Sequence, residues 1–309
     1  MILVTGATGR LGQAVCRRLL QKGFKTRALV RKGAMTGFSQ GRVSGWKAAK
    51  RLYELAPKVQ DGFLAARESG WRVQGNEHLL QKGVEPFVGD VTDAKSLSGA
   101  CKGVDTVIHL AASLDFMGGR EKLFAINSTG TENIANAASD AGVKHFILAS
   151  SISVYGKNIA GEKIDENSPT VPTTDYGASK LASEQSASNF SSRMRITALR
   201  IGVVYGPGFN DGYMAVFRML KKGKMRILGA GGNIIPFVHA DDVADAIMLA
   251  AGAKSCTPGM EIYNIVQNET LSQSQILKLA AEAVGAAPPH KAYGCKACVG
   301  CRKRHGAWR

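Results

Sequence analysis

The stretch that most constrains the fold lies near the start of the chain and reads Thr5-Gly6-Ala7-Thr8-Gly9-Arg10-Leu11-Gly12. It follows a short apolar run and leads into residues 13–21, where apolar side chains recur at helical spacing. This pattern predicts a strand, a tight glycine turn and a helix. We expect Gly6 and Gly9 to adopt backbone angles closed to other residues and to admit a ligand, whereas Gly12 lets the helix sit close to the strand. The N–H groups that start the helix then suit a diphosphate.

Further apolar runs alternate with helical patterns along the chain, at residues 24–30, 84–88, 104–110 and 146–149. This alternation predicts an α/β fold, a Rossmann-type doubly wound parallel sheet, with a small and truncated C-terminal substrate lobe. We assign residues 1–206 and 234–255 to the dinucleotide-binding domain and residues 207–233 and 256–289 to the lobe. Within the lobe, residues 261–266 and 272–284 are expected to form a strand and a helix.

Residues 35–78 interrupt this rhythm as an atypical insertion between the second and third strands. They carry two helical apolar faces separated by Pro57. Two readings stay open for this stretch: a helical hairpin beside the adenosine end of the fold, or sequence foreign to the fold.

Composition excludes several classes of protein. No apolar run reaches the roughly 18 residues of a membrane helix, and the N-terminus has no basic leader, so a cytoplasmic protein without membrane contact is expected. The net charge is +16, but residues 288–309 hold six Lys or Arg and no acid. Since the excess charge belongs partly to this tail, nucleic acid is not expected as the main partner.

The same tail contains Cys295, Cys298, Cys301 and His305, at gaps that zinc ligands also use. Little apolar sequence surrounds them that would support a metal site. We therefore expect residues 290–309 to be a disordered, Cys-rich basic tail without a metal.

The end of the second strand bears on the choice of cofactor. A site selective for NAD places an acid there, but this chain has Arg31 followed by Lys32. Two cations, with Arg10 in the glycine turn, suit a 2′-phosphate and predict NADP. The alternative is NAD, with these cations solvated. Asp90, followed by Val91 after the third strand, is placed to accept the adenine amino group, or else Thr92 or Asp93 merely caps a helix.

Chemistry is carried by Tyr176 and Lys180, which are four residues apart and therefore on one face of a predicted helix. A nearby ammonium favours the phenolate, so Tyr176 is a candidate acid and base for a hydroxyl group. Ser151 follows the fifth strand, where open α/β sheets bind ligands, and is placed to hydrogen-bond a developing alkoxide.

Taken in order, these motifs resemble the extended short-chain dehydrogenase/reductases, which include the NAD(P)-dependent epimerase/dehydratases. The resemblance is carried by TGATGRLG (5–12), GDVTD (89–93), HLAA (109–112), NSTGTENI (127–134), SSISVYG (150–156), YGASK (176–180), LRIGVVYGPG (199–208) and PFVHADDVADAI (236–247).

The resemblance implies catalytic roles for Ser151, Tyr176 and Lys180, with Asn127 in support. It implies that Pro207 lies near the nicotinamide and that a homodimer forms through the helices of Asn127 and Tyr176. The candidate cofactor-binding residues are Gly6, Thr8, Gly9, Arg10, Leu11, Gly12, Arg31, Asp90, Val91, Leu110, Ala111, Ala112, Tyr176, Lys180 and Pro207.

Three functions stay open. Residues 201–203 lack the Asn, and residues 233–236 lack the Arg, that sugar-nucleotide epimerases of this family commonly carry, which favours a dehydrogenase or reductase acting on a ketone or secondary alcohol. Basic residues at 221–226 keep a nucleotide-sugar 4-epimerase or dehydratase open. A redox sensor that binds NADP without catalysis is the third reading, and the intact Tyr176 and Lys180 argue against it.

Overall fold

The computed structural model describes residues 1–32, 83–115, 119–157, 163–206, 209, 213–253, 257–289 and 292–293. Within these, the chain divides into two compact units. The described part of the first unit comprises residues 1–32, 83–204 without the gaps at 116–118 and 158–162, and 238–266 without the gap at 254–256. The second unit holds the remaining segments and is treated by itself below.

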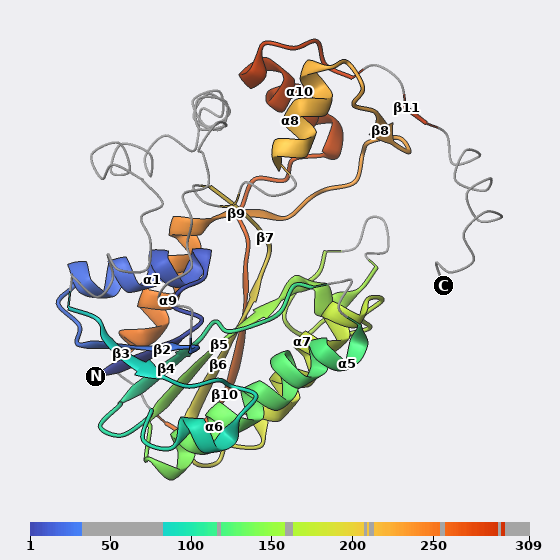
Figure 1. Ribbon diagram of the computed structural model, residues 1–309. Helices are drawn as coiled ribbons and strands as arrows, with labels where there is room; N and C mark the ends of the chain where they lie inside the picture. The colour runs from blue at the N-terminus through green and yellow to red at the C-terminus, as the bar shows by residue number, and fades with distance from the viewer. Residues whose placement is uncertain are drawn as a thin grey trace. The chain divides into compact units, whose positions relative to one another are not determined.

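A parallel sheet of seven strands forms the centre of the first unit (Figure 1). Its strand order is β3-β2-β1-β4-β5-β6-β10. The bounds are β1 Ile2–Thr5, β2 Thr26–Val30, β3 Glu85–Val88, β4 Thr106–His109, β5 His145–Ser151, β6 Arg195–Ile201 and β10 Gly259–Ile265. The order turns back at β1, so the predicted Rossmann-type doubly wound sheet is confirmed.

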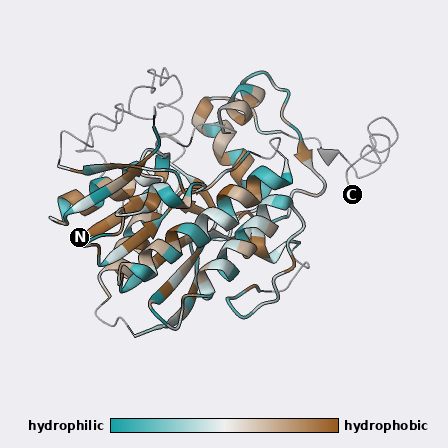
Figure 2. Cartoon of the chain, turned by 60° about the horizontal axis from the view of Figure 1, so that its bottom comes forward, coloured by the Kyte–Doolittle hydropathy of each residue, from teal (hydrophilic) through white to brown (hydrophobic). Residues whose placement is uncertain are grey.

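Helices cover both faces of this sheet (Figure 1). On one face α1 (Arg10–Gln21) packs against α9 (Ala240–Ala251), and an ion pair joins Arg18 to Asp245. The other face carries α5 (Arg120–Phe124), α6 (Gly130–Asp140) and α7 (Asp175–Ser188). Figure 2 shows the apolar colouring concentrated on the strands between these layers, where the core contains Leu3, Val107, Phe146 and Ile196. A sheet enclosed on both faces needs such continuously apolar strands.

Strand β10 lies elsewhere than the sequence predicts. The assignment of residues 261–266 to the substrate lobe is wrong, because β10 pairs in parallel with β6 from Gly259 opposite Arg195 to Ile265 opposite Ile201. Apolar periodicity alone does not say which strand a late segment will pair with, and the open backbone edge of β6 supplies its partner.

The helical segment from Arg120 to Asp140 is interrupted. A π-helical turn, Ala125–Thr129, separates α5 from α6 and contains Asn127. The Thr131 hydroxyl donates to the Asn127 carbonyl at 2.6 Å, and Gly130 packs against Val91, so both contacts meet at this turn. Turns of this kind are frequent at functional sites.

The second unit contains α8 (Tyr213–Lys221) and α10 (Gln273–Val284), which share a small core of Phe217, Leu220, Ala280 and Ala281. Ser272 and Gln275 form a capping box at the start of α10. Two short strands, β8 (Ile227–Leu228) and β11 (Ala292–Tyr293), pair in parallel. The chain passes between the units through β7 (Val203–Tyr205) and β9 (Phe237–His239). In the described segments no helix has the length and hydrophobicity of a membrane span.

Candidate active site

The glycine turn is held by backbone contacts that leave no room for side chains. Gly6 has φ +67°, and a Cβ there would lie 2.7 Å from the Ala111 nitrogen. A Cβ on Gly12 would lie 2.1 Å from the Gly6 carbonyl oxygen. The expectation for Gly9 is wrong in one respect, since its φ of −73° is open to any residue. Its role is to end the turn as the N-cap of α1, where it has no side chain to cover the helix start.

The start of α1 therefore presents a cradle suited to a diphosphate. Gly9 N–H donates to the Gly6 carbonyl, and Gln13 N–H donates to the Gly9 carbonyl, so the turn is closed on itself. The backbone N–H groups that begin an α-helix have no carbonyl of a preceding helical turn to bond, so the start of α1 can offer N–H donors to a ligand. Arg10 is exposed and Thr8 and Leu11 are partly buried. The positive end of the helix dipole adds to this fit.

Strands β2 and β3 bring the residues expected around the adenosine to the same edge of the sheet. Arg31 and Lys32 follow β2 and are both exposed. Asp90 follows β3 and accepts hydrogen bonds from the Thr92 N–H and hydroxyl through its Oδ1. The alternative role for Asp93 is also present, because it caps the 3₁₀ turn Ala94–Leu97. Val91 is buried, and its carbonyl accepts from the Asn133 side chain.

After β4, the segment Leu110–Ala112 lies beside the glycine turn and is joined to it through Thr5, which also contacts His109. Ala111 N–H donates to Thr5 Oγ1 at 3.2 Å, and Thr5 Oγ1 lies 2.6 Å from His109 Nδ1. His109 Nε2 lies 3.0 Å from Thr131 Oγ1, whose proton goes to the Asn127 carbonyl. The Thr131 oxygen must therefore accept from Nε2–H, so Nδ1 accepts from Thr5. Burial, followed by the charge of Lys180, lowers the pKa of His109 to about 3.

Asn127 is nearly fully buried and fastens the loop after β4 to α7. Its Oδ1 accepts from Ser113 N–H at 2.7 Å, and its Nδ2 donates to the Ser113 carbonyl and to Ser179 Oγ. Ser179 in turn donates to the Tyr176 carbonyl at 2.8 Å. A continuous set of hydrogen bonds thus runs from the glycine turn through His109 and Asn127 to the helix that carries Tyr176.

The structure brings Ser151, Tyr176 and Lys180 together at the carboxyl end of β5. Ser151 ends β5, and its hydroxyl opposes the rise in the pKa of the Tyr176 phenol that burial causes. Thr174 caps α7, so Tyr176 lies in the first turn of that helix and Lys180 one turn later. A Cβ on Gly177 would lie 2.4 Å from the Ser153 carbonyl, which shows how closely α7 approaches the turn after β5.

Burial governs the protonation of this site. It raises the pKa of Tyr176, and the hydrogen bond with Ser151 opposes that shift. The pKa of Tyr176 is thus raised, whereas the sequence predicts that the charge of Lys180 lowers it. The reason is that the side chains of Tyr176 and Lys180 have both lost contact with solvent. Burial lowers the pKa of Lys180 to about 8, and the charge of Glu184 opposes the shift. The protein by itself therefore holds Tyr176 as a neutral phenol at neutral pH.

Some predicted site residues lie outside the described residues: Pro207, Cys295, Cys298, Cys301 and His305. Within the described residues no group of three or more metal-ligating side chains occurs. Other polar residues of the site escaped sequence reasoning: Thr5, Ser113, Thr131, Ser179, Glu184 and Arg200. Two signals were available in the sequence. Thr5 and Arg200 are polar residues inside otherwise apolar strands, and Glu184 lies one helical turn after Lys180.

The comparison with protein families decides the assignment. The sequence profile described as "NAD dependent epimerase/dehydratase family" matches residues 2–265. The chain belongs to this family. Its relatives include an epimerase and a dehydrogenase, and the epimerase/dehydratase family predicted from the sequence is confirmed.

Two curated relatives have different chemistry. N-acetyl-alpha-D-glucosaminyl-diphospho-ditrans,octacis-undecaprenol 4-epimerase of Escherichia coli O157:H7 is 30% identical over 195 residues, which is 62% of this chain and 58% of that protein. The 3 beta-hydroxysteroid dehydrogenase/Delta 5-->4-isomerase of Mycobacterium tuberculosis (strain CDC 1551 / Oshkosh) is 32% identical over 222 residues, or 65% and 58%. The chain thus spans under two thirds of the length of these relatives.

Among solved structures, MoeE5 in complex with UDP-glucose and NAD aligns with a TM-score of 0.68 and 25% identity, over 95% of this chain and 85% of that one. This likeness agrees with the Rossmann-type fold and with the NAD-binding character of the family. The predicted homodimer and cytoplasmic location stay predictions.

Proposed function

We propose that this protein transfers a hydride between a nicotinamide dinucleotide and a secondary alcohol or ketone carbon, with Tyr176 as the acid and base. The observation that carries the proposal is the placement of Ser151, at the carboxyl end of β5, next to Tyr176, with Lys180 one turn along the same helix. Open α/β sheets bind their ligands at this end of the strands.

The residues present fit the dinucleotide. The uncapped start of α1 and the bare Gly6 to Gly12 turn would hold the diphosphate, and Asp90 and Val91 would flank the adenine. Leu110, Ala111 and Ala112 would line the path between them. When bound, the nicotinamide supplies the carbon that gives or accepts the hydride.

The side chains of this chain manage the proton. In the reducing direction Tyr176 donates its phenolic proton to the substrate oxygen. Burial raises the pKa of Tyr176 and so keeps the phenol protonated for this step. Ser151 Oγ donates a hydrogen bond to the same oxygen while negative charge develops there. The ammonium of Lys180 stabilises the phenolate that remains. In the oxidising direction the same groups work in reverse.

Substitution of Tyr176 tests this assignment. Tyr176→Phe keeps the ring and removes the exchangeable proton, so we expect kcat to fall about 100-fold or more with cofactor binding retained. Tyr263→Phe, a change at an exposed tyrosine of β10, is the matched control. A screen of ketones with NADPH, followed by absorbance of the reduced nicotinamide, supplies the assay. Unchanged turnover in Tyr176→Phe would remove the catalytic role of Tyr176, whereas cofactor binding without turnover of any ketone by the unaltered protein would favour a binding protein.

For the cofactor we propose NADP, because Arg31, Lys32 and Arg10 are all exposed cations and β2 ends without an acid. The double variant Arg31→Ala/Lys32→Ala should weaken NADPH binding about 10-fold or more while NADH binding stays within about twofold. Lys25→Ala, at the opposite end of β2, is the control. Tighter binding of NADH than of NADPH by the unaltered protein would reverse the proposal in favour of NAD.

A second candidate function is 4-epimerisation of a nucleotide sugar. It is supported by the likeness to the UDP-glucose complex and the curated epimerase, and by the basic Lys221, Lys222 and Lys224 of the second unit. Arg226 is less available, since it donates to the carbonyls of Gly223 and Met225. Exchange of the C4 configuration of a UDP-hexose without net cofactor turnover would favour the epimerase, whereas steady oxidation of NADPH with a ketone would favour the reductase.

A further inference from the structure

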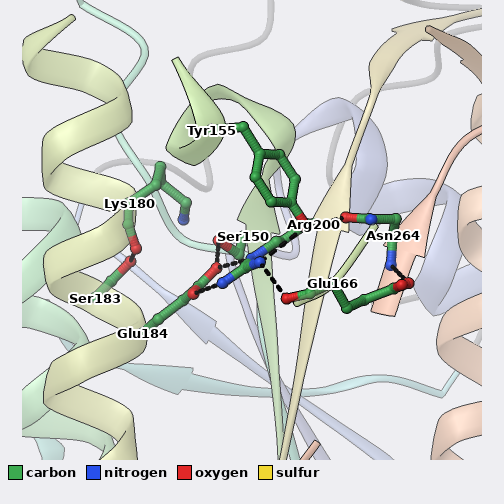
Figure 3. A network of polar contacts seen from close by, with 8 residues as sticks. All are labelled: Ser150, Tyr155, Glu166, Lys180, Ser183, Glu184, Arg200 and Asn264. Atoms are coloured by element: carbon green, nitrogen blue, oxygen red, sulfur yellow. Dashed lines mark hydrogen bonds and ion pairs between the residues drawn. The ribbon is translucent and has the colours of Figure 1, made fainter. Parts of the chain in front are cut away.

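One buried carboxylate joins separate parts of the candidate site (Figure 3). Glu184 lies on α7 one turn after Lys180. Its Oε1 accepts from Ser150 Oγ at 2.5 Å and from Arg200 Nε at 3.0 Å, and its Oε2 accepts from Arg200 Nη2 at 2.8 Å. Ser150 directly precedes Ser151, so this carboxylate links the end of β5 to the helix that carries Tyr176.

Arg200 is fixed from several sides. Its Nη1 donates to the Tyr155 hydroxyl at 2.8 Å and to the Glu166 carbonyl at 3.3 Å. The Tyr155 hydroxyl donates to Asn264 Oδ1, and the Asn264 N–H donates to Glu166 Oε1. Figure 3 shows this network reaching from α7 across β6 to β10. A guanidinium held in this way presents its fork to a carboxylate in one orientation.

The charges in this network are out of solvent. The side chains of Glu184 and Arg200 are each only 4% exposed, and Lys180 is 3% exposed. In the described part of the chain, Glu184 is the only buried carboxylate, whereas two buried cations lie beside it. Removal of a carboxylate from such a place leaves uncompensated buried charge, which is far more costly than the same loss at the surface.

Other titratable groups around Lys180 do not replace this counter-charge. Tyr176 lies on α7 one turn before Lys180. Arg200 and His109 approach Lys180 from the sheet, and burial keeps His109 neutral. Tyr155 lies in the turn after β5 and adds no negative charge while protonated. Further groups on the elements packed against α7 are the exposed Arg120, Glu121, Lys122, Glu132 and Asp140, and, at the opposite ends of β5 and β6, His145 and Arg195.

We propose that Glu184, anchored by Arg200, is a positioning residue of this site: its carboxylate fixes the end of β5 against α7 and supplies the negative charge that balances the buried ammonium of Lys180. The inference rests on the proposed function for its consequence, because the role of Lys180 requires the charged form. Burial works against that form, and the Glu184 charge works for it.

The protonation of Lys180 can be measured without any substrate. Lysine labelled with ¹³C is incorporated into the full chain, the Lys180 signal is assigned by its loss in Lys180→Arg, and its Cε shift is followed against pH. We expect the pKa of Lys180 to fall by about one unit or more in Glu184→Gln, since a charge one helical turn away is removed. Glu261→Gln is the matched control, because Glu261 also pairs with an arginine of β6, Arg195, but at the other end of that strand.

A Lys180 pKa that stays the same in Glu184→Gln would overturn the proposal. Should Glu184→Gln fail to fold, Glu184→Asp decides, because it keeps the negative charge but withdraws it by one methylene. A measurable fall in the Lys180 pKa relative to the unaltered protein, smaller than the one expected for Glu184→Gln, supports the proposal. An unchanged Lys180 pKa overturns it. Where turnover is found, the loss of kcat/KM on the alkaline side should move to lower pH by the same amount. If no turnover is found, the proposed function fails while the titration still decides the role of Glu184.

Discussion

The hydrogen bonds around His109 lead to a quantitative prediction for Thr131→Val. Valine keeps the shape of threonine but removes the hydroxyl that donates to the Asn127 carbonyl and accepts from His109 Nε2. The buried His109 N–H is then left without an acceptor, which costs about 1–3 kcal/mol, and the lost bond to Asn127 adds about 1 kcal/mol. We therefore expect the free energy of unfolding to fall by about 2–4 kcal/mol.

Urea unfolding measures this change, with an unchanged m value as the sign that the native and unfolded states keep their compactness. The control is Thr131→Ser, which retains the hydroxyl and loses one buried methyl group worth about 1 kcal/mol. In the unaltered protein, two-bond proton–nitrogen NMR correlations should also show the His109 proton on Nε2. A Thr131→Val variant within about 0.5 kcal/mol of Thr131→Ser, or a proton on Nδ1, would refute the hydrogen-bond order derived above.

Two further predictions concern stability. Gly6→Ala should lower the free energy of unfolding by about 2 kcal/mol or more, because Gly6 has a positive φ and an added Cβ would lie 2.7 Å from the Ala111 backbone. Gly142→Ala is the control, since Gly142 also has a positive φ but faces open space, and it should cost only about 1 kcal/mol. Equal urea midpoints for the two variants would contradict the packing argument. Acid should also destabilise the protein, because burial lowers the pKa of His109 to about 3 and of His145 to about 4, so between pH 6.5 and about 4 the unfolded chain binds protons that the native chain does not. Between pH 7 and pH 5 each histidine should remove about 2 kcal/mol, and His145→Gln should show about half of the combined effect; a free energy of unfolding that does not change with pH would exclude this linkage.

Local patterns were enough to predict much of this fold. The turn from Thr5 to Gly12 is recognisable because strand, glycines and helix follow one another within twenty residues, and the structure has β1 and α1 there. Ser151, Tyr176 and Lys180 are placed together for a similar reason, since the end of a strand and one turn of a helix fix each side chain by spacing.

Contacts between distant segments could not be predicted in this way. The π-helical turn at Asn127 involves Thr131 and the packing of Gly130 on Val91, 39 positions earlier in the chain, and nothing in residues 125–129 marks it. From the sequence alone, Glu184 looks like one more polar residue on a helix of mixed polar and small residues. Only the arrival of Arg200 and Ser150 from the sheet shows that it is buried.

The pairing of β10 with β6 affects how this protein folds while it is being synthesised. Strand β6 ends at Ile201, but its partner β10 begins only at Gly259. Residues 205–237 of the second unit are synthesised between these two strands. During translation β6 therefore has one flank of unpaired N–H and C=O groups, a template on which other nascent chains can assemble. We therefore expect a chaperone that shields this flank until residue 265 has emerged to raise the yield of folded protein.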